Sequence, residues 1–141
     1  MGGLCYTTGD KSRVHQGYPV HNLNLYLLAK AYPPHLSIID GYVGMVGNGP
    51  VSGNPAEWGV AIVSQDPVAA DCLAAQLMGF DISDIGYLWY CCKKGVGVGE
   101  ISEMDILGAN SEDCYYRFRP HSAYEAQKGW RDESVSRLLK I

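Results

Sequence analysis

The sequence lacks a run of about 20 apolar residues, the length that a helix needs to cross the hydrocarbon core of a bilayer. Its first residues, Met1 to Leu4, also lack the charged start and apolar stretch of a signal peptide. We therefore expect no membrane partner and a cytoplasmic location.

An excess of positive charge is missing as well. The chain has 11 Lys and Arg against 15 Asp and Glu, a formal net charge of -4. Binding to nucleic acid depends on a basic surface that meets the phosphates, so we expect no nucleic-acid partner. The aromatic and basic run 115–120 is predicted to pack against the domain or a partner rather than to stack on bases.

The cysteines lack the C-x-x-C spacing of a zinc or iron-sulfur ligand pair, and their odd number does not suit a secreted disulfide framework. The sequence therefore contains no iron-sulfur cluster motif and does not identify a cofactor. We expect reduced and mostly buried thiols. The five are Cys5, Cys72, Cys91, Cys92 and Cys114.

What is present suits one globular domain. The 141 residues are 47% apolar, enough to bury a core, and we expect a single α/β domain over 1–141. Its motifs fall within 11–108, and an aromatic and helical tail follows over 109–141.

Helical spacing of apolar residues and end signals predict four helices. The clearest follows Asp66, an N-cap residue, with Pro67 at its first position and Gly79 just beyond its end. Ser83 is predicted to cap the next helix, and Gly95 to end it. The predicted ranges are 20–32, 67–78, 84–94 and 132–141.

Two continuous apolar runs, 36–39 and 58–64, predict strands that are covered on both faces. Such strands are typical of a mainly parallel central sheet flanked by helices in three layers, which is the fold we expect. Residues 102–108 are predicted to add a short edge strand.

A glycine-rich stretch follows the first strand and is predicted to be a loop that holds a ligand. In a parallel sheet its start, after Asp40, would lie beside the end of the second strand at Ser64, where open α/β sheets bind ligands. Cations from the N-terminal arm, residues 1–19, could assist. The predicted ligand-binding residues are Lys11, Arg13, Asp40, Gly41, Gly44, Gly47, Asn48, Gly49, Ser52, Gly53 and Asp66.

The chemistry of this predicted site has two components. Loop amides and a helix N-terminus suit an anion, whereas Asp40, Asp66 and Asp71 suit a metal ion or a proton. Purely structural roles remain open alternatives: Asp40 and Asn48 would tie the loop internally, Asp66 would only cap its helix, Asp71 would face solvent, and the N-terminal arm would be solvated.

The segments that carry these residues resemble the C-terminal part of the family called domain of unknown function 362. They are Lys11, His15, 40–50, Gly53, Gly59-Val60, 66–71, 77–79 and 106–108. The resemblance implies an association with iron-sulfur proteins and redox work, although this chain has no cluster motif. It also implies a missing N-terminal half, so we expect a homo-oligomer or a partner that covers the exposed sheet edge and apolar faces.

Three functional hypotheses follow. The first is a binding domain for a small anionic or metal-bound ligand, with a redox relation implied by the family association. The second is a hydrolase-like or isomerase-like enzyme in which Asp40 or Asp71 acts as general base with His15 as its partner. The third is a non-catalytic assembly module.

Overall fold

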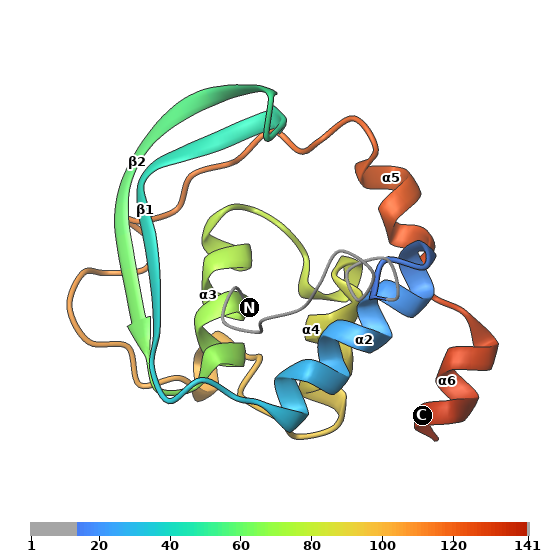
Figure 1. Cartoon of the computed structure of the whole chain (residues 1–141). Coiled ribbons are helices and arrows are strands. Elements are labelled where there is room, and N and C mark those ends of the chain that lie inside the picture. The colour runs from blue at the N-terminus through green and yellow to red at the C-terminus, as the bar shows by residue number, and fades with distance from the viewer. Residues whose placement is uncertain (1–13, 141) are drawn as a thin grey trace.

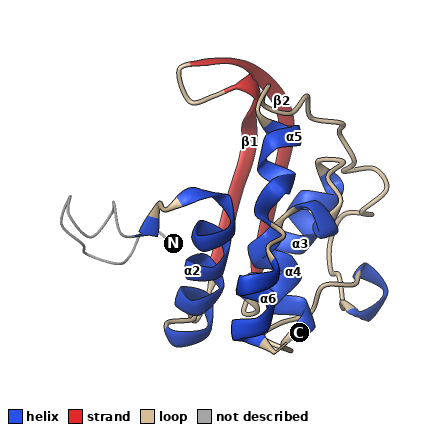
Figure 2. Cartoon of the chain, turned by 90° about the vertical axis from the view of Figure 1, so that its right-hand side faces the viewer, coloured by secondary structure: helices blue, strands red, loops and turns tan. Residues whose placement is uncertain are grey.

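The computed structural model describes residues 14–140 and shows a curved hairpin with helices on its concave side (Figures 1 and 2). None of the described helices is long and apolar enough to cross a membrane. The strands are β1 (Ser37–Asn48) and β2 (Ser52–Ser64), and short 3-10 turns form at Ile82–Asp84, Ile101–Glu103 and Lys128–Trp130. The named helices are α2 (Gly17–Ala31), α3 (Pro67–Leu77), α4 (Gly86–Lys93), α5 (Tyr124–Gln127) and α6 (Glu133–Leu139).

The predicted sheet is wrong. Within the described part of the chain, the only sheet is the antiparallel pair of β1 and β2, in place of a mainly parallel sheet in a three-layer fold. Three residues, 49–51, join the two strands, whereas a parallel pair needs a crossover of a dozen or more residues. The edge strand predicted over 102–108 is also absent, and a 3-10 turn forms at its start.

The glycine-rich stretch is mostly strand rather than loop, because β1 continues to Asn48. Gly41 and Gly44 lie beside the aromatic rings of Trp58 on β2 and Phe118 of the C-terminal segment. A Cβ at Gly41 would stand 2.5 Å from the Trp58 ring, and one at Gly44 would stand 2.6 Å from the Phe118 ring. These glycines therefore make room for the half-buried Trp58 ring and the buried Phe118 ring, a demand that the local sequence does not reveal.

A β-bulge interrupts the pairing near the middle of the hairpin. Gly41 pairs with Val60 and Val43 with Glu57, so Tyr42 on β1 faces two residues of β2. One of them, Gly59, has φ +72°, a left-handed conformation that favours glycine. The Asp40 carboxylate accepts a hydrogen bond from the Tyr42 N–H at 3.0 Å, which gives that amide a partner beside the bulge.

The predicted helices are confirmed with adjusted ends. Asp66 caps α3, Pro67 begins it and Gly79 follows its end with φ +80°. The prediction that Ser83 caps the next helix is wrong, since α4 begins only at Gly86. Asp81 instead caps the preceding 3-10 turn through the Ser83 N–H.

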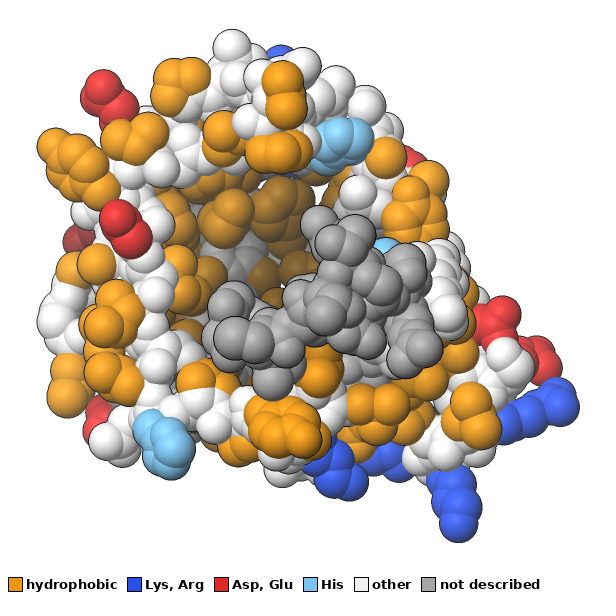
Figure 3. Space-filling model, viewed as in Figure 1, with side chains coloured by type: hydrophobic (Ala, Val, Ile, Leu, Met, Phe, Trp, Pro, Cys, Tyr) orange, Lys and Arg blue, Asp and Glu red, His pale blue; other side chains and the backbone are white. Residues whose placement is uncertain are grey.

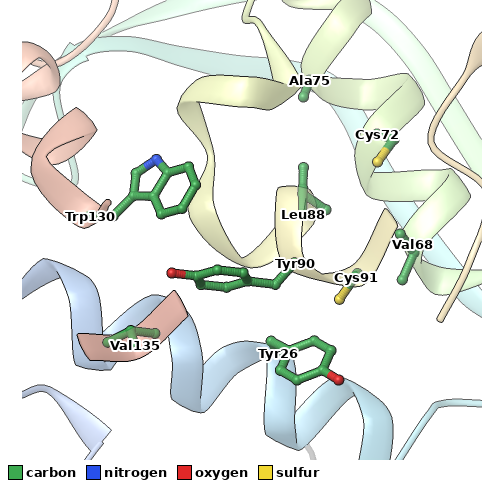
Figure 4. Close-up of a cluster of buried hydrophobic side chains, with 9 residues drawn as sticks. All are labelled: Tyr26, Val68, Cys72, Ala75, Leu88, Tyr90, Cys91, Trp130 and Val135. Atoms are coloured by element: carbon green, nitrogen blue, oxygen red, sulfur yellow. The ribbon is translucent and has the colours of Figure 1, made fainter. Parts of the chain in front are cut away.

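The main core joins segments that are far apart in the sequence (Figure 4). Tyr90 of α4 makes edge-to-face contacts with Tyr26 of α2 and with Trp130, and Val135 of α6 packs in the same cluster. The predicted packing of 115–120 is confirmed by Phe118, which is buried against Trp58 with ring centroids 5.3 Å apart. The C-terminal tail therefore contributes to the core directly.

Tyr90 supplies a test of this core. Its side chain is fully buried, and its hydroxyl has no hydrogen-bond partner among the described residues. A buried hydroxyl without a partner costs about 1–3 kcal/mol of desolvation. We therefore expect Tyr90→Phe to leave the free energy of unfolding unchanged or to raise it by about 1 kcal/mol, as measured by urea titration. A loss of more than about 1 kcal/mol would show that the hydroxyl is satisfied.

Candidate functional site

A cavity of about 410 Å³ lies between the end of β2, α3 and the segment after α4. Its walls are mainly apolar, with Leu73 and Leu77 from α3 and Met104 from the later segment. The complete lining is Ala61, Ile62, Val63, Ser64, Asp66, Ala69, Ala70, Leu73, Leu77, Val98, Glu103, Met104, Asp105, Ile106, Leu107, Ala109, Ser111 and Cys114.

The polar groups of this pocket are acidic or hydroxyl-bearing. Glu103 and Asp105 are exposed, while Ser64, Asp66 and Ser111 are half-buried. Among the residues that the structure describes, the lining contains no Lys, Arg or His. Its electrostatic potential therefore favours a cation or a hydrogen-bond donor over an anion.

Asp66 is the predicted ligand residue that lines the pocket, and its oxygens are occupied. Oδ1 accepts the N–H groups of Val68 and Ala69 at 2.9 and 3.0 Å. Oδ2 accepts the Val98 N–H at 2.9 Å, which fastens the segment after α4 to the start of α3. Its own N–H donates to the Ser64 hydroxyl at 3.0 Å. Asp66 therefore shapes the pocket, and the first amides of α3 are not free to hold an anion.

The other predicted carboxylates lie elsewhere. Asp40 is exposed near the start of β1, opposite Ala61, and Asp71 accepts a hydrogen bond from the Tyr87 hydroxyl at 2.8 Å. Over residues 14–140 no three His, Cys, Asp or Glu side chains come together as a metal site. Asp40, Asp66 and Asp71 therefore do not form the predicted cluster.

The Tyr87 contact has a defined protonation state. Burial, and secondarily the negative charge of Asp71, raise the pKa of Tyr87 well above its ordinary value. The phenol therefore stays protonated at neutral pH and donates to the Asp71 carboxylate. The Tyr87 hydroxyl therefore occupies one oxygen of Asp71, which was predicted as a candidate general base.

The predicted loop residues tie the hairpin to the C-terminal segment. The Gly47 N–H donates to the Arg119 carbonyl at 2.8 Å, and the Asn48 side chain accepts the Ser122 N–H at 2.9 Å. Gly49 donates back to the Gly47 carbonyl at 2.9 Å. Ser52 and Gly53 begin β2, where they pair with Asn48 and Gly47.

The N-terminal candidates contribute no described contact to the pocket. The His15 ring stacks on the His21 ring with centroids 4.4 Å apart, before and within α2. Lys11 and Arg13 lie outside the described residues. No hydrogen bond joins His15, Asp40 and Asp71 within the described part of the chain, so the proton-transfer arrangement of the enzyme hypothesis has no geometric support.

Two described cysteines, Cys72 and Cys91, are inert at neutral pH. Cys72 and Cys91 are buried free thiols, and the Cys72 and Cys92 sulfurs are 3.7 Å apart. Burial raises the pKa of Cys91 to about 12 and that of Cys72 higher still. Because the thiolate is the nucleophile and the metal ligand, these thiols are unreactive in the folded protein.

The sequence interpretation missed Glu103, Asp105 and Ser111. The first two fall in the segment that was predicted to be an edge strand, where alternate residues would face opposite sides. In the structure Glu103, Met104 and Asp105 all line the pocket. Acidic and apolar residues alternate over 103–106, and this pattern was the available signal for the site. In a strand, however, it predicts acidic and apolar side chains on opposite faces rather than in one pocket.

The family model described as domain of unknown function (DUF362) matches residues 1–76, more than half of the chain. The chain belongs to the DUF362 family. The matched part of this DUF362 chain contains β1, β2 and Asp66 but not the 98–111 side of the pocket. That the match falls in the family's C-terminal part, and that redox work follows, stay predictions.

One curated relative extends the comparison. The DUF362 chain is 40% identical over 57 residues to the thylakoid-associated protein sll1697 of Synechocystis sp. (strain ATCC 27184 / PCC 6803 / Kazusa). The aligned part covers 40% of this chain and 18% of that protein, so the chain spans about a fifth of the relative's length. No solved structure matches the chain.

Proposed function

We propose that this DUF362 chain binds a small molecule with an apolar body and a positively charged group, in the pocket between β2, α3 and residues 98–111. The observation that carries the proposal is the lining, which over residues 14–140 combines apolar walls with acidic side chains and has no cationic one. The enzyme hypothesis is not pursued, because its proton-transfer residues have other partners.

The size and walls of the pocket suit such a ligand. Small-molecule sites usually have volumes of about 300–1,000 Å³, and this cavity has about 410 Å³. Leu73, Leu77 and Met104 offer apolar surface that a ligand would cover. Burial of that surface contributes about 25 cal/mol per Å², so the apolar body supplies most of the affinity.

The charged groups decide the sign of the ligand. Glu103 and Asp105 belong to the lining and are exposed, so an anion in the pocket would meet two carboxylates without a compensating cation. The amides of Val68 and Ala69, which could otherwise attract an anion at the start of α3, donate to Asp66. The pocket therefore favours an amine over the anionic ligand that the sequence suggested.

Hexylamine and hexanoate test this proposal, because they share an apolar chain and differ in the sign of their charge. We expect hexylamine to shift the backbone NMR signals of residues around the pocket, and hexanoate to bind at least about threefold more weakly. Equal binding of the two compounds, or shifts confined to another region, would contradict the proposal.

Two variants and a control locate the effect. We expect the double variant Glu103→Gln, Asp105→Asn to weaken hexylamine binding by about threefold to tenfold, since exposed charge pairs contribute about 0.2–1 kcal/mol each. Glu100→Gln removes an exposed acid outside the lining and should leave binding unchanged. Ala69→Leu adds bulk to the wall and should weaken both compounds.

A further inference from the structure

The hairpin has an open edge. β1 pairs with β2 on one side, and no described strand pairs with its other side. The described hydrogen bonds of the β1 backbone outside the pair are those of Gly47 with Arg119 and Gly49, near the turn, and that of the Tyr42 N–H with the Asp40 side chain. Residues 37–45 therefore have no described strand partner on this side, and of their amides the Tyr42 N–H donates to the Asp40 carboxylate.

The Asp40 charge and the bulge beside Tyr42 limit further pairing at this edge, but the commonest protective residues are missing from β1. Exposed edge strands usually carry Lys or Pro, which discourage further pairing. β1 has neither, and β2 has Pro55. Apolar side chains instead stand in solvent on the convex face of the hairpin, with Ile38 68%, Tyr42 75% and Val63 61% exposed.

A hollow lies beside β1. Figure 3 shows it between the hairpin and the helices, with hydrophobic side chains on its walls, and β1 is the strand nearer to it in this view (Figures 1 and 3). A strand added to β1 would extend the sheet over this hollow. Its alternate side chains would point toward the hollow and toward the convex face, because side chains of a strand alternate between its two sides.

The charges of the hairpin indicate which charge an added strand should carry. Over 37–64 the charged residues are Asp40 and Glu57, both acidic and exposed, without any Lys or Arg. A second copy joined through this edge would place two Asp40 carboxylates on neighbouring strands, while the Arg119 guanidinium lies at the turn end of the hairpin, where it donates to Asn54. A strand with basic residues would instead place a positive charge beside Asp40, and opposite charges on neighbouring strands are stabilising.

We propose that the free edge of β1, residues 37–45, binds an extended segment of another polypeptide that alternates apolar and basic residues. The apolar side chains face the hollow, and the basic ones lie on the convex face near Asp40. Backbone hydrogen bonds supply affinity, and the alternation of side chains supplies specificity. This surface is separate from the acidic pocket, whose residues lie on the β2 side of the hairpin.

The probe is a fluorescein-labelled nine-residue peptide of alternating valine and lysine with blocked ends. Its twin has glutamate for lysine, and a third peptide has the lysine composition with valines and lysines in pairs. We expect the alternating lysine peptide to bind on the order of tenfold more tightly than either of the others in fluorescence anisotropy. Bound peptide should slow hydrogen exchange at the amides of residues 37–45.

Matched variants separate this contact from general attraction to an acidic protein. Asp40→Asn keeps an oxygen for the Tyr42 N–H but removes the charge, and should reduce the preference for the lysine peptide by about twofold to fivefold. Asp113→Asn, the same change at an exposed acid outside the hairpin, should leave the preference unchanged. Circular dichroism confirms that both variants are folded.

Several results would overturn the proposal. They are equal binding of the three peptides, absence of binding, exchange protection outside β1, and equal effects of Asp40→Asn and Asp113→Asn. Sedimentation that shows a dimer with its β1 amides protected would assign the edge to a second copy and would likewise overturn it. None of these results bears on hexylamine binding, so the pocket and the edge are tested independently.

Discussion

Trp130→Ala is expected to lower the free energy of unfolding by about 3–5 kcal/mol, the usual cost of removing a large aromatic ring from a core. Trp130 is 2% exposed and packs against Tyr90, with ring centroids 5.2 Å apart. Its indole N–H also donates to the Asp84 carbonyl at 2.9 Å. Urea titration measures the loss, and the melting midpoint should fall by on the order of 10 °C.

Two further variants make the interpretation specific. Trp130→Phe keeps a ring but loses the hydrogen bond to Asp84, so its cost should be intermediate, about 1–3 kcal/mol. Leu138→Ala changes an apolar residue that is 73% exposed on α6, and should cost less than about 0.5 kcal/mol. A small effect of Trp130→Ala would show that the C-terminal segment does not belong to the core.

Asp66→Ala is expected to lower the free energy of unfolding by about 2–4 kcal/mol, because one side chain serves two segments. Loss of a helix N-cap costs about 0.5–2 kcal/mol. The Val98 N–H also loses its partner, which adds about 1–3 kcal/mol if the amide stays buried. The same change should weaken hexylamine binding, since Val98 belongs to the pocket lining.

Asp66→Asn separates the two roles. The asparagine oxygen can still accept the Val68 and Ala69 N–H groups, as Oδ1 does in the native protein. Its amide nitrogen cannot accept the Val98 N–H, so the stability loss should be about half that of alanine. Chemical denaturation gives the stability, and faster hydrogen exchange at Val98 in both variants reports the freed segment. Equal exchange in native protein and variants would show that Asp66 does not hold that segment.

The helices were predictable because their signals are local. Asp66, Pro67 and Gly79 mark the ends of α3 within a few residues of sequence, and a capping side chain acts on amides two or three positions away. Pro33 and Pro34 likewise follow the end of α2. Each of these elements needs its tertiary neighbours for stability but not for its position.

The sheet and the site were not predictable in the same way. The runs 36–39 and 58–64 were located, yet their direction depended on whether glycines 41–49 formed a loop or a strand. The contacts that require glycine within the strand come from distant residues. The Trp58 ring lies against Gly41, 17 residues away in the sequence, and the Phe118 ring against Gly44, 74 residues away. Asp40 was selected for its place after a strand, and it lies within one.

The sequence by itself determined the helix positions, the capping role of Asp66, the absence of an apolar run long enough for a membrane-spanning helix, and a resemblance to DUF362 that the family match confirms. The tertiary structure alone decided that the strands are antiparallel, that Glu103 and Asp105 line a pocket, and that one edge of β1 is open among the described residues. The physical reason is how far apart in the sequence the interacting groups lie. Caps and turns depend on neighbours along the chain, whereas strand direction, pocket lining and exposed edges depend on groups that only folding brings together.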